Sequence, residues 1–212
     1  MEFQLDDDQK LISKTVADFV KRELPLERMR KMRDDDLGFS RDVYRQMGEL
    51  GWLGIHLPES VGGFGGSFVD AALVLEQFGT TLVSEPYVAS SVLGGKAILL
   101  SGSADQHERW LSPMVTGESQ LAFAYAETQS RYSAHRVSTR AERAAGGYRI
   151  KGEKRWVLAG HSADQIVVSA RTSGDEGDAE GVSLFVIDKQ DTQLVFVACC
   201  HCQLHGIAES PS

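Results

Sequence analysis

Cysteine is almost absent from this sequence. Its 212 residues include 3 cysteines, and all of them fall between Cys199 and Cys202. A network of disulfide bonds therefore cannot hold the body of the chain together. The chain is nevertheless long enough to bury a hydrophobic core that folds without such crosslinks.

Positive charge and long apolar runs are also scarce. Lys and Arg number 22 against 30 Asp and Glu, a formal net charge of −8, which disfavours binding to nucleic acid or to an anionic membrane. The longest apolar run, Leu194 to Cys200, is far shorter than the roughly 20 residues that span a bilayer. Residues 1–8 lack the basic and apolar regions of a secretory signal. We therefore expect a cytoplasmic protein with neither a membrane nor a nucleic acid as partner.

Helical signals fill the first 118 residues. Asp6 and Gln9 have the spacing of a capping box at the start of a helix over 6–24, whose apolar residues repeat at helical spacing. The charged segment 28–36 is predicted as a solvated helix end or a loop. Further helices are predicted over residues 41–50, 67–78, 83–100 and 106–114.

The residue composition changes near Gly117 from one typical of helices to one typical of β-strands. Short segments rich in β-branched and aromatic residues predict strands over 121–126, 137–142, 148–151, 155–158, 165–170 and 182–187. Gly146 and Gly147 predict a hairpin turn between the second and third of them. Short strands with frequent turns favour a sandwich or a barrel. The sequence thus predicts a helical domain at 1–118, an incomplete β domain at 119–189 and an aberrant tail at 190–212.

Short motifs follow one another along this architecture. They occupy Leu50–Ile55, Leu57–Gly63, Leu75–Gly79, Arg109–Pro113, Ala122–Glu127 and Ile150–Gly160. In their order and spacing they closely resemble the acyl-CoA dehydrogenase family, from about residue 4 to residue 189. The resemblance implies an α+β fold, with an N-terminal all-helical domain followed by a small antiparallel β-barrel-like domain. The family's C-terminal helical bundle is absent from these residues.

The resemblance also implies a chemistry. The family's enzymes are FAD-dependent oxidoreductases of fatty acid metabolism that introduce an α,β double bond into an acyl-CoA thioester. A glutamate takes the α-proton and the β-hydride passes to the flavin. The implied partners are the acyl-CoA substrate, a homologous subunit in a homo- or hetero-oligomer, and an electron-acceptor flavoprotein.

Five residues are implied flavin contacts on two strand ends. Phe123, Tyr125 and Ala126 lie on the strand that would run beside the flavin and offer main-chain hydrogen bonds. Trp156 would stack on the isoalloxazine ring, whereas the residues alone would also allow a core or hinge tryptophan. The family's two flavin-contacting threonines are replaced here by Ala126 and Leu158, so side-chain donors are lost.

The loop after the first strand departs from the family pattern. Tyr132 replaces a small serine near the phosphates, and the resemblance makes Tyr132 a flavin contact and Tyr132 and Ser133 substrate contacts. Arg131 reads either as a phosphate partner or as a surface arginine. Glu127 occupies a position that is structural in the family. The run Gln129–Tyr132 is most similar to the small-subunit branch typified by pimeloyl-CoA dehydrogenase.

No residue of this chain is predicted to be catalytic, because the family's glutamate base lies beyond residue 212. We therefore expect a truncated chain that is inactive alone. One alternative is a flavin monooxygenase or acyl-CoA oxidase on the same fold. Another is a non-catalytic partner subunit that binds a full-length homologue. Enoyl-CoA formation, peroxide or hydroxylated product, and partner binding without flavin would distinguish the three.

The tail has a composition of its own. Cys199, His201, Cys202 and His205 are ligand types that zinc accepts. A structural zinc site usually takes its ligands from two separated pairs, so no metal is predicted. An alternative natural terminus and a lost reading frame remain, and the abrupt change after Lys189 favours the lost frame.

Overall fold

The computed structural model describes residues 4–130, 133–144, 147–189, 193–197 and 201–208. The chain divides into two compact units. The first comprises Met1–Glu85 with Val115–Glu118, and the second comprises Pro86–Met114 with Ser119–Ser212. The helical segments just before the sheet therefore group with the sheet, whereas the sequence prediction placed everything up to residue 118 in one domain.

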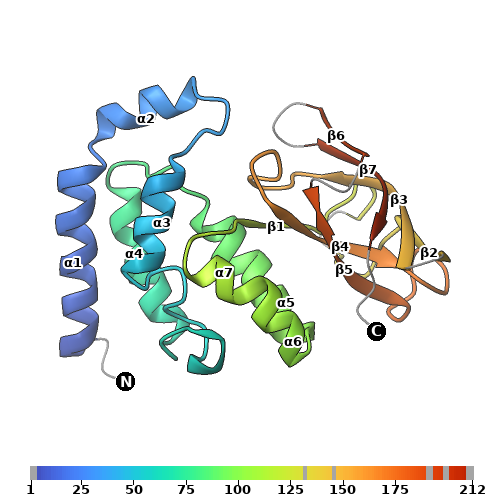
Figure 1. The fold of residues 1–212 in the computed structure, drawn as a ribbon, viewed down its shortest axis with the longest axis horizontal. Helices are drawn as coiled ribbons and strands as arrows, with labels where there is room; N and C mark the ends of the chain where they lie inside the picture. Colours follow the sequence, from blue (N-terminus) through green and yellow to red (C-terminus); the bar gives the residue numbers. More distant parts are fainter. Residues whose placement is uncertain (1–3, 131–132, 145–146, 190–192, 198–200, 209–212) are drawn as a thin grey trace. The chain divides into compact units, whose positions relative to one another are not determined.

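The first unit is built from helices. Its elements are α1 (Asp7–Glu23), α2 (Leu26–Arg33), α3 (Arg41–Glu49), the short 3₁₀ turn η1 (Glu59–Val61) and α4 (Phe68–Gly79). The predicted capping box at α1 is confirmed, since the backbone N–H of Gln9 donates to the Asp6 carboxylate at 2.8 Å. The segment predicted as a helix end or loop forms α2, a helix with no buried residue. Figure 1 shows α1, α3 and α4 side by side.

Aromatic rings fill the core of this unit. The Phe19 ring meets the Trp52 ring edge-on at 5.1 Å between centroids, and Trp52 meets Phe78 at 6.0 Å. All three side chains are buried. Edge-on pairs of this kind stabilise a core beyond their buried area, so the α1 face predicted to be apolar packs as expected.

The second unit begins with a helical region that is not one regular helix. Its elements are the π-helix η2 (Val88–Gly95), α5 (Lys96–Ser101), α6 (Ala104–Gln106), the π-helix η3 (His107–Leu111) and α7 (Ser112–Val115), whose last residue belongs to the first unit. The prediction of one helix over 83–100 is thus wrong in its form. Residues 83–86 are not helical, and the helix that follows widens where it packs on the first strand. A Cβ on Gly94 would lie 2.7 Å from the Cβ of Leu121.

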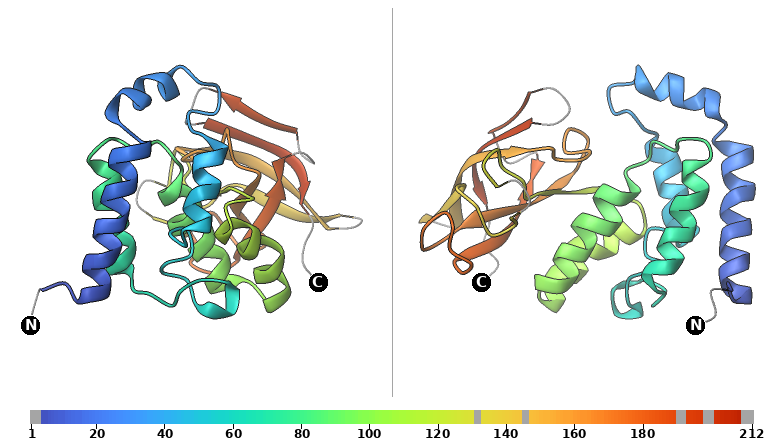
Figure 2. Two further views of the ribbon diagram at one scale, coloured as in Figure 1. Left: turned by 60° about the vertical axis from the view of Figure 1, so that its left-hand side comes forward. Right: turned by 180° about the vertical axis from the view of Figure 1, so that it is seen from behind.

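The sheet supplies the rest of the second unit. Its strands are β1 (Leu121–Ala124), β2 (Arg140–Ala144), β3 (Gly147–Arg155), β4 (Gln165–Arg171), β5 (Val182–Asp188), β6 (Gln193–Val197) and β7 (His201–Ala208). Within the described residues the order is β1-β4-β2-β3-β7-β6, and β5 also pairs with β4. Neighbours are antiparallel except that β1 and β2 run parallel to β4. The predicted α+β class is confirmed, with a mixed rather than a purely antiparallel sheet (Figure 2).

One strand-region prediction is confirmed and one changes. The hairpin joining β2 to β3 is confirmed by the pairing of Ala144 with Gly147. The segment 155–158 is not a separate strand, because β3 continues without a break to Arg155 and ends there. The chain leaves the strand at Trp156, whose backbone φ is 54°.

Two strands lie inside the predicted tail. β6 pairs with β7, and β7 pairs along β3 from Tyr148 opposite Ala208 to Arg155 opposite His201. Cys199 and Cys200 lie outside the described residues. The interpretation of this segment as out of frame stays a prediction.

Candidate functional site

The end of β1 and the end of β3 meet at one place in the second unit. The backbone N–H of Arg155 donates to the Ala126 carbonyl at 2.8 Å. The Lys154 ammonium donates to the Tyr125 carbonyl at 3.4 Å. Two segments that are distant in the sequence, the predicted strand segment Phe123–Ala126 and Trp156, are thereby brought to the same region of the unit. The strand itself ends at Ala124, two residues before the predicted end.

Large apolar side chains are exposed at these two ends. The exposed fraction is 57% for Trp156, 54% for Leu158 and 42% for Tyr125. The ring of Phe123 lies 5.2 Å from that of Tyr125, and Ala126 is buried. Exposed aromatic and aliphatic groups that gather in one region are typical of a surface that binds a partner or a ligand.

The Trp156 backbone is strained. Its φ of 54° lies in the left-handed region, which non-glycine residues with bulky side chains seldom adopt. Ala159, three residues later, has a φ of 52°. Such conformations persist only where surrounding contacts enforce them, and they are concentrated at functional sites.

A buried carboxylate lies directly behind the end of β1. One Glu127 oxygen accepts hydrogen bonds from the N–H and hydroxyl of Thr139 at 3.1 and 2.6 Å and from the Lys154 ammonium at 2.7 Å. The other accepts from the N–H and hydroxyl of Ser138 at 2.8 and 2.6 Å and from Gln129 at 2.6 Å. Glu127 is buried, so its side chain faces the interior of the unit.

These donors decide the charge of Glu127. Burial by itself would raise the pKa of the carboxyl, but the hydrogen bonds from Lys154, Ser138 and Thr139 outweigh it and lower the pKa to about 2. Burial lowers the pKa of Lys154, and the Glu127 charge offsets part of that effect. The arrangement is an ion pair in which every carboxylate oxygen has several donors.

A cleft of about 970 Å³ lies at another place in the second unit. It is lined by Gln129, Ser130, Ser133, Ala134, His135, Arg136, Asp175, Glu176 and Gly177. The Ser133 hydroxyl lies 3.1 Å from Nε2 of His135, and Arg136 pairs with Glu176 at 3.2 Å. The predicted substrate residue Ser133 thus lines a cleft, whereas Tyr132 and Arg131 fall outside the described residues.

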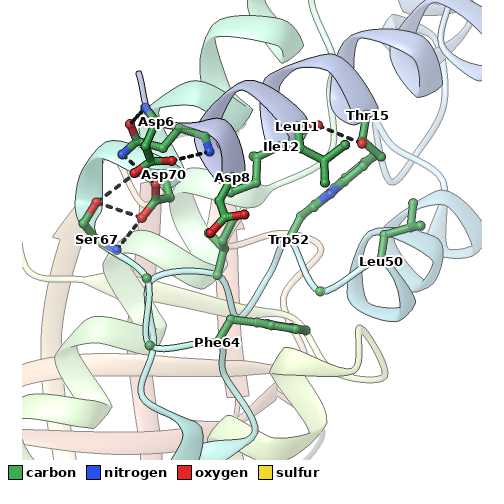
Figure 3. A pocket seen from close by; sticks show the side chains of 15 residues that line it. Asp6, Asp8, Leu11, Ile12, Thr15, Leu50, Trp52, Phe64, Ser67 and Asp70 are labelled. Carbon is green, nitrogen blue, oxygen red and sulfur yellow. Dashed lines mark hydrogen bonds between the residues drawn. The ribbon is translucent and has the colours of Figure 1, made fainter. Parts of the chain in front are cut away.

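The first unit carries a groove of its own, of about 760 Å³. Figure 3 shows Leu11, Ile12 and Thr15 of α1 along one side, with Trp52 and Phe64 facing them. Leu11 and Phe64 are 62% and 66% exposed. The groove is therefore apolar along its walls.

Carboxylates stand at one end of this groove. Asp6 and Asp8 line it, as does Asp70, which accepts hydrogen bonds from Ser67 and Gln9. Burial would raise the pKa of Asp70, but these hydrogen bonds lower it on balance. The groove could not be predicted from the sequence, because Leu11 and Phe64 belong to segments more than fifty positions apart.

The residues that the structure describes lack two kinds of feature. No group of three or more His, Cys, Asp or Glu side chains there is placed to hold a metal ion. No helix in the part of the chain that the structure describes is long and apolar enough to cross a membrane.

Comparison with known proteins connects this architecture to one family. Residues 6–118 match the acyl-CoA dehydrogenase N-terminal domain, and residues 122–199 match the acyl-CoA dehydrogenase middle domain. The second match extends past Lys189 into the predicted tail.

Individual relatives lead to the same family. The caffeyl-CoA reductase-Etf complex subunit CarC of Acetobacterium woodii is 32% identical over 84% of this chain and 47% of its own. The benzylmalonyl-CoA dehydrogenase of Aromatoleum aromaticum is 31% identical over 89% of this chain and 49% of its own. A crystal structure of an acyl-CoA dehydrogenase from Bacillus anthracis, complexed with FAD, has a TM-score of 0.83 at 27% identity and covers 97% of this chain and 37% of that one.

This chain therefore spans about half the length of the curated relatives that it matches. Both matched domains occur in the family's order, and together they account for the helical part and most of the sheet. The chain belongs to the acyl-CoA dehydrogenase family.

Proposed function

We propose that these residues form the flavin-bearing front part of an FAD-dependent acyl-CoA dehydrogenase, which introduces an α,β double bond into an acyl-CoA thioester. The observation that carries the proposal is the exposed apolar region at Trp156, with its strained backbone, beside the end of β1. The named activities of the relatives, a dehydrogenase and a reductase of CoA thioesters, support the same redox interconversion.

The residues at the two strand ends fit a flavin on its apolar side. Trp156 and Tyr125 offer exposed rings to the isoalloxazine system, and Leu158 would exclude water from it. Ala126 and Leu158 carry no side-chain donor, so hydrogen bonds to the flavin edge would come from the main chain. FAD, when bound, supplies the acceptor for the substrate's β-hydride.

Glu127 does not serve as the base in this proposal. Its two oxygens accept hydrogen bonds from Ser138, Thr139, Gln129 and Lys154, and a carboxylate with a pKa of about 2 is a poor match to proton abstraction near neutral pH. We infer that Glu127 organises the strand end, and that the α-proton is taken by a group outside the described part of this unit.

The cleft at Ser133 is our proposed place for part of the CoA moiety. Ser133 offers a hydroxyl, His135 an imidazole and Arg136 a guanidinium, which are groups that bind amides and phosphates. The Ser133 contact comes from the family resemblance, and the cleft supports it by giving that residue an open volume.

We place the electron-accepting flavoprotein at the groove of the first unit. CarC is named as a subunit of a complex with Etf, so a flavoprotein partner is the occupant to which we commit. The apolar walls at Leu11 and Phe64 suit an apolar side chain of that partner, and Asp6 and Asp8 at the rim suit basic residues beside it.

Flavin retention tests the proposed function. The 212-residue chain alone should purify largely colourless and bind FAD more weakly than micromolar, because the strand ends offer only one side of a flavin site. Joining the chain to the C-terminal half of a relative should give one flavin per chain after gel filtration, and Trp156→Ala should reduce it at least tenfold. Trp110→Ala is the matched control. Full flavin retention in the Trp156→Ala protein would assign Trp156 to the core instead.

A substitution in the groove tests the acceptor surface. In the same joined protein, Leu11→Asp should lower kcat/KM for an electron-transferring flavoprotein at least tenfold, because it places a charge on an apolar contact wall. Reduction of a small dye by the same variant should be unchanged. Leu100→Asp, at a residue 77% exposed outside the groove, is the control. An equal decrease in kcat/KM for Leu11→Asp and Leu100→Asp would contradict the proposal that the groove binds the electron acceptor.

A further inference from the structure

The two strand ends that carry the exposed apolar region are not neighbours in the sheet. β1 pairs with β4, and β3 pairs with β2 and β7. The strand order places β4 and β2 between them. The ladder of the sheet therefore does not fix the end of β1 against the end of β3, and other contacts must do so.

A buried ammonium connects the two ends through side chains. The Lys154 side chain is completely buried, and its Nζ donates to the Glu127 carboxylate at 2.7 Å, the Ser169 hydroxyl at 2.9 Å and the Tyr125 carbonyl at 3.4 Å. Three donors on one nitrogen meet three acceptors, which is the full capacity of a lysine. Lys154 belongs to β3, Ser169 to β4, and Tyr125 and Glu127 to the segment after β1.

We propose that Lys154 is a positioning residue that fixes the segment after β1 against the end of β3 and thereby sets the orientation of Trp156. Trp156 follows Lys154 by two residues, and within the described residues the Arg155 N–H bond to Ala126 is the main-chain bond that joins the same segments. A tryptophan at a φ of 54° relaxes unless its neighbours hold it. The consequence for flavin binding rests on the proposed function, whereas the positioning itself does not.

The identity of the residue matters to this role. An arginine presents five donors in a flat fork, whereas the acceptors here surround one point. A methionine has a similar length and fills the space but donates nothing. Lys154→Met therefore removes the side-chain connection while keeping the volume. Ser169→Ala removes one acceptor of Lys154, together with the hydrogen bond that the Ser169 hydroxyl donates to the Tyr125 carbonyl at 3.4 Å, and leaves the ion pair.

Fluorine NMR on the chain labelled with 5-fluorotryptophan tests the proposal. The sequence has 3 tryptophans, so the spectrum should contain one resonance each for Trp52, Trp110 and Trp156, and Trp156→Phe assigns the last. Lys154→Met should shift or broaden the Trp156 resonance and leave the other two in place. Ser169→Ala should move it in the same direction by less.

A destabilising change without these contacts is the matched control. Ile187→Ala empties part of the buried core of the same unit and should lower Tm, yet leave the Trp156 resonance where it is. An unmoved Trp156 resonance in Lys154→Met, or an equal movement in Ile187→Ala, would overturn the proposal. If Lys154→Met does not fold, Ser169→Ala decides, because an unchanged resonance there contradicts the shared acceptor role.

Titration with FAD separates this inference from the proposed function. We expect FAD to bind at least tenfold more weakly to the Lys154→Met protein than to the Ile187→Ala protein. A displaced Trp156 resonance with unchanged FAD affinity would keep the positioning role and reject the flavin site at Trp156.

Discussion

Replacing Glu127 with glutamine should lower the free energy of unfolding by about 3–5 kcal/mol, the usual cost of removing one partner of a buried ion pair. The change leaves the Lys154 cation buried without its counterion and turns one acceptor oxygen into a donor among donors from Ser138 and Thr139. Chemical denaturation followed by circular dichroism measures it. Glu176→Gln, which alters a half-exposed pair with Arg136, should change stability by less than about 1 kcal/mol.

A double variant separates the effect of charge from the effect of packing in this pair. The double variant Glu127→Gln/Lys154→Met should be more stable than the sum of the two single changes predicts, because it leaves no unpaired charge. A Glu127→Gln protein within about 0.5 kcal/mol of the original chain, a difference expected of an ordinary surface site, would contradict the buried pair.

The free energy of unfolding should depend on pH through the Glu127 carboxylate. The pKa of Glu127 in the folded chain is about 2, below its ordinary value of 4.5. The stability that the carboxylate contributes is therefore present above pH 4.5 and is lost as pH falls from 4.5 toward 2. The Glu127→Gln protein should lack this component of the pH dependence.

Much of the helical part could be predicted from local rules. Asp6 and Gln9 form a capping box because both groups belong to the same turn, so a short stretch of sequence contains the whole interaction. The π-helical form of residues 88–95 could not be predicted in this way, since the pattern of small and apolar residues does not distinguish i→i+5 from i→i+4 bonding.

The sheet shows a similar limit. The sequence predicted separate strands over 148–151 and 155–158, yet β3 runs without a break through Gly152 to Arg155. A Cβ there would lie 2.4 Å from Oγ1 of Thr139, so the glycine permits a close approach by β2's leading segment instead of reversing the chain. Contacts across the fold, which no local pattern contains, decided the conformation.

The residues of the candidate site also differ in how far they could be predicted from the sequence. The motif that contains Trp156 could be found because its neighbours occur in a fixed order along the chain. The burial of Lys154 could not, because it lies among charged residues that read as exposed and its partner Glu127 is 27 positions earlier. A contact between side chains from different segments leaves no periodic pattern in the sequence of either segment.

Mixing the 212-residue chain with excess FAD, an acyl-CoA and a dye acceptor should give no detectable dye reduction. The carboxylate that follows the proposed flavin strand, Glu127, is buried under six hydrogen bonds. General-base catalysis contributes roughly 10²–10⁴-fold, and orientation of the substrate against base and flavin adds about 10⁵–10⁸ M of effective molarity. Without these contributions, the rate of dye reduction should lie below the detection limit.

Turnover after joining this chain to the C-terminal half of a relative tests the central claim most directly. The claim is that these residues are the flavin-bearing front part of an acyl-CoA dehydrogenase. The joined protein should become yellow and should reduce the dye with formation of enoyl-CoA, and the same C-terminal half alone should do neither. A folded joined protein that stays colourless and inactive would contradict the claim, and so would turnover by the 212-residue chain alone that Glu127→Gln abolishes.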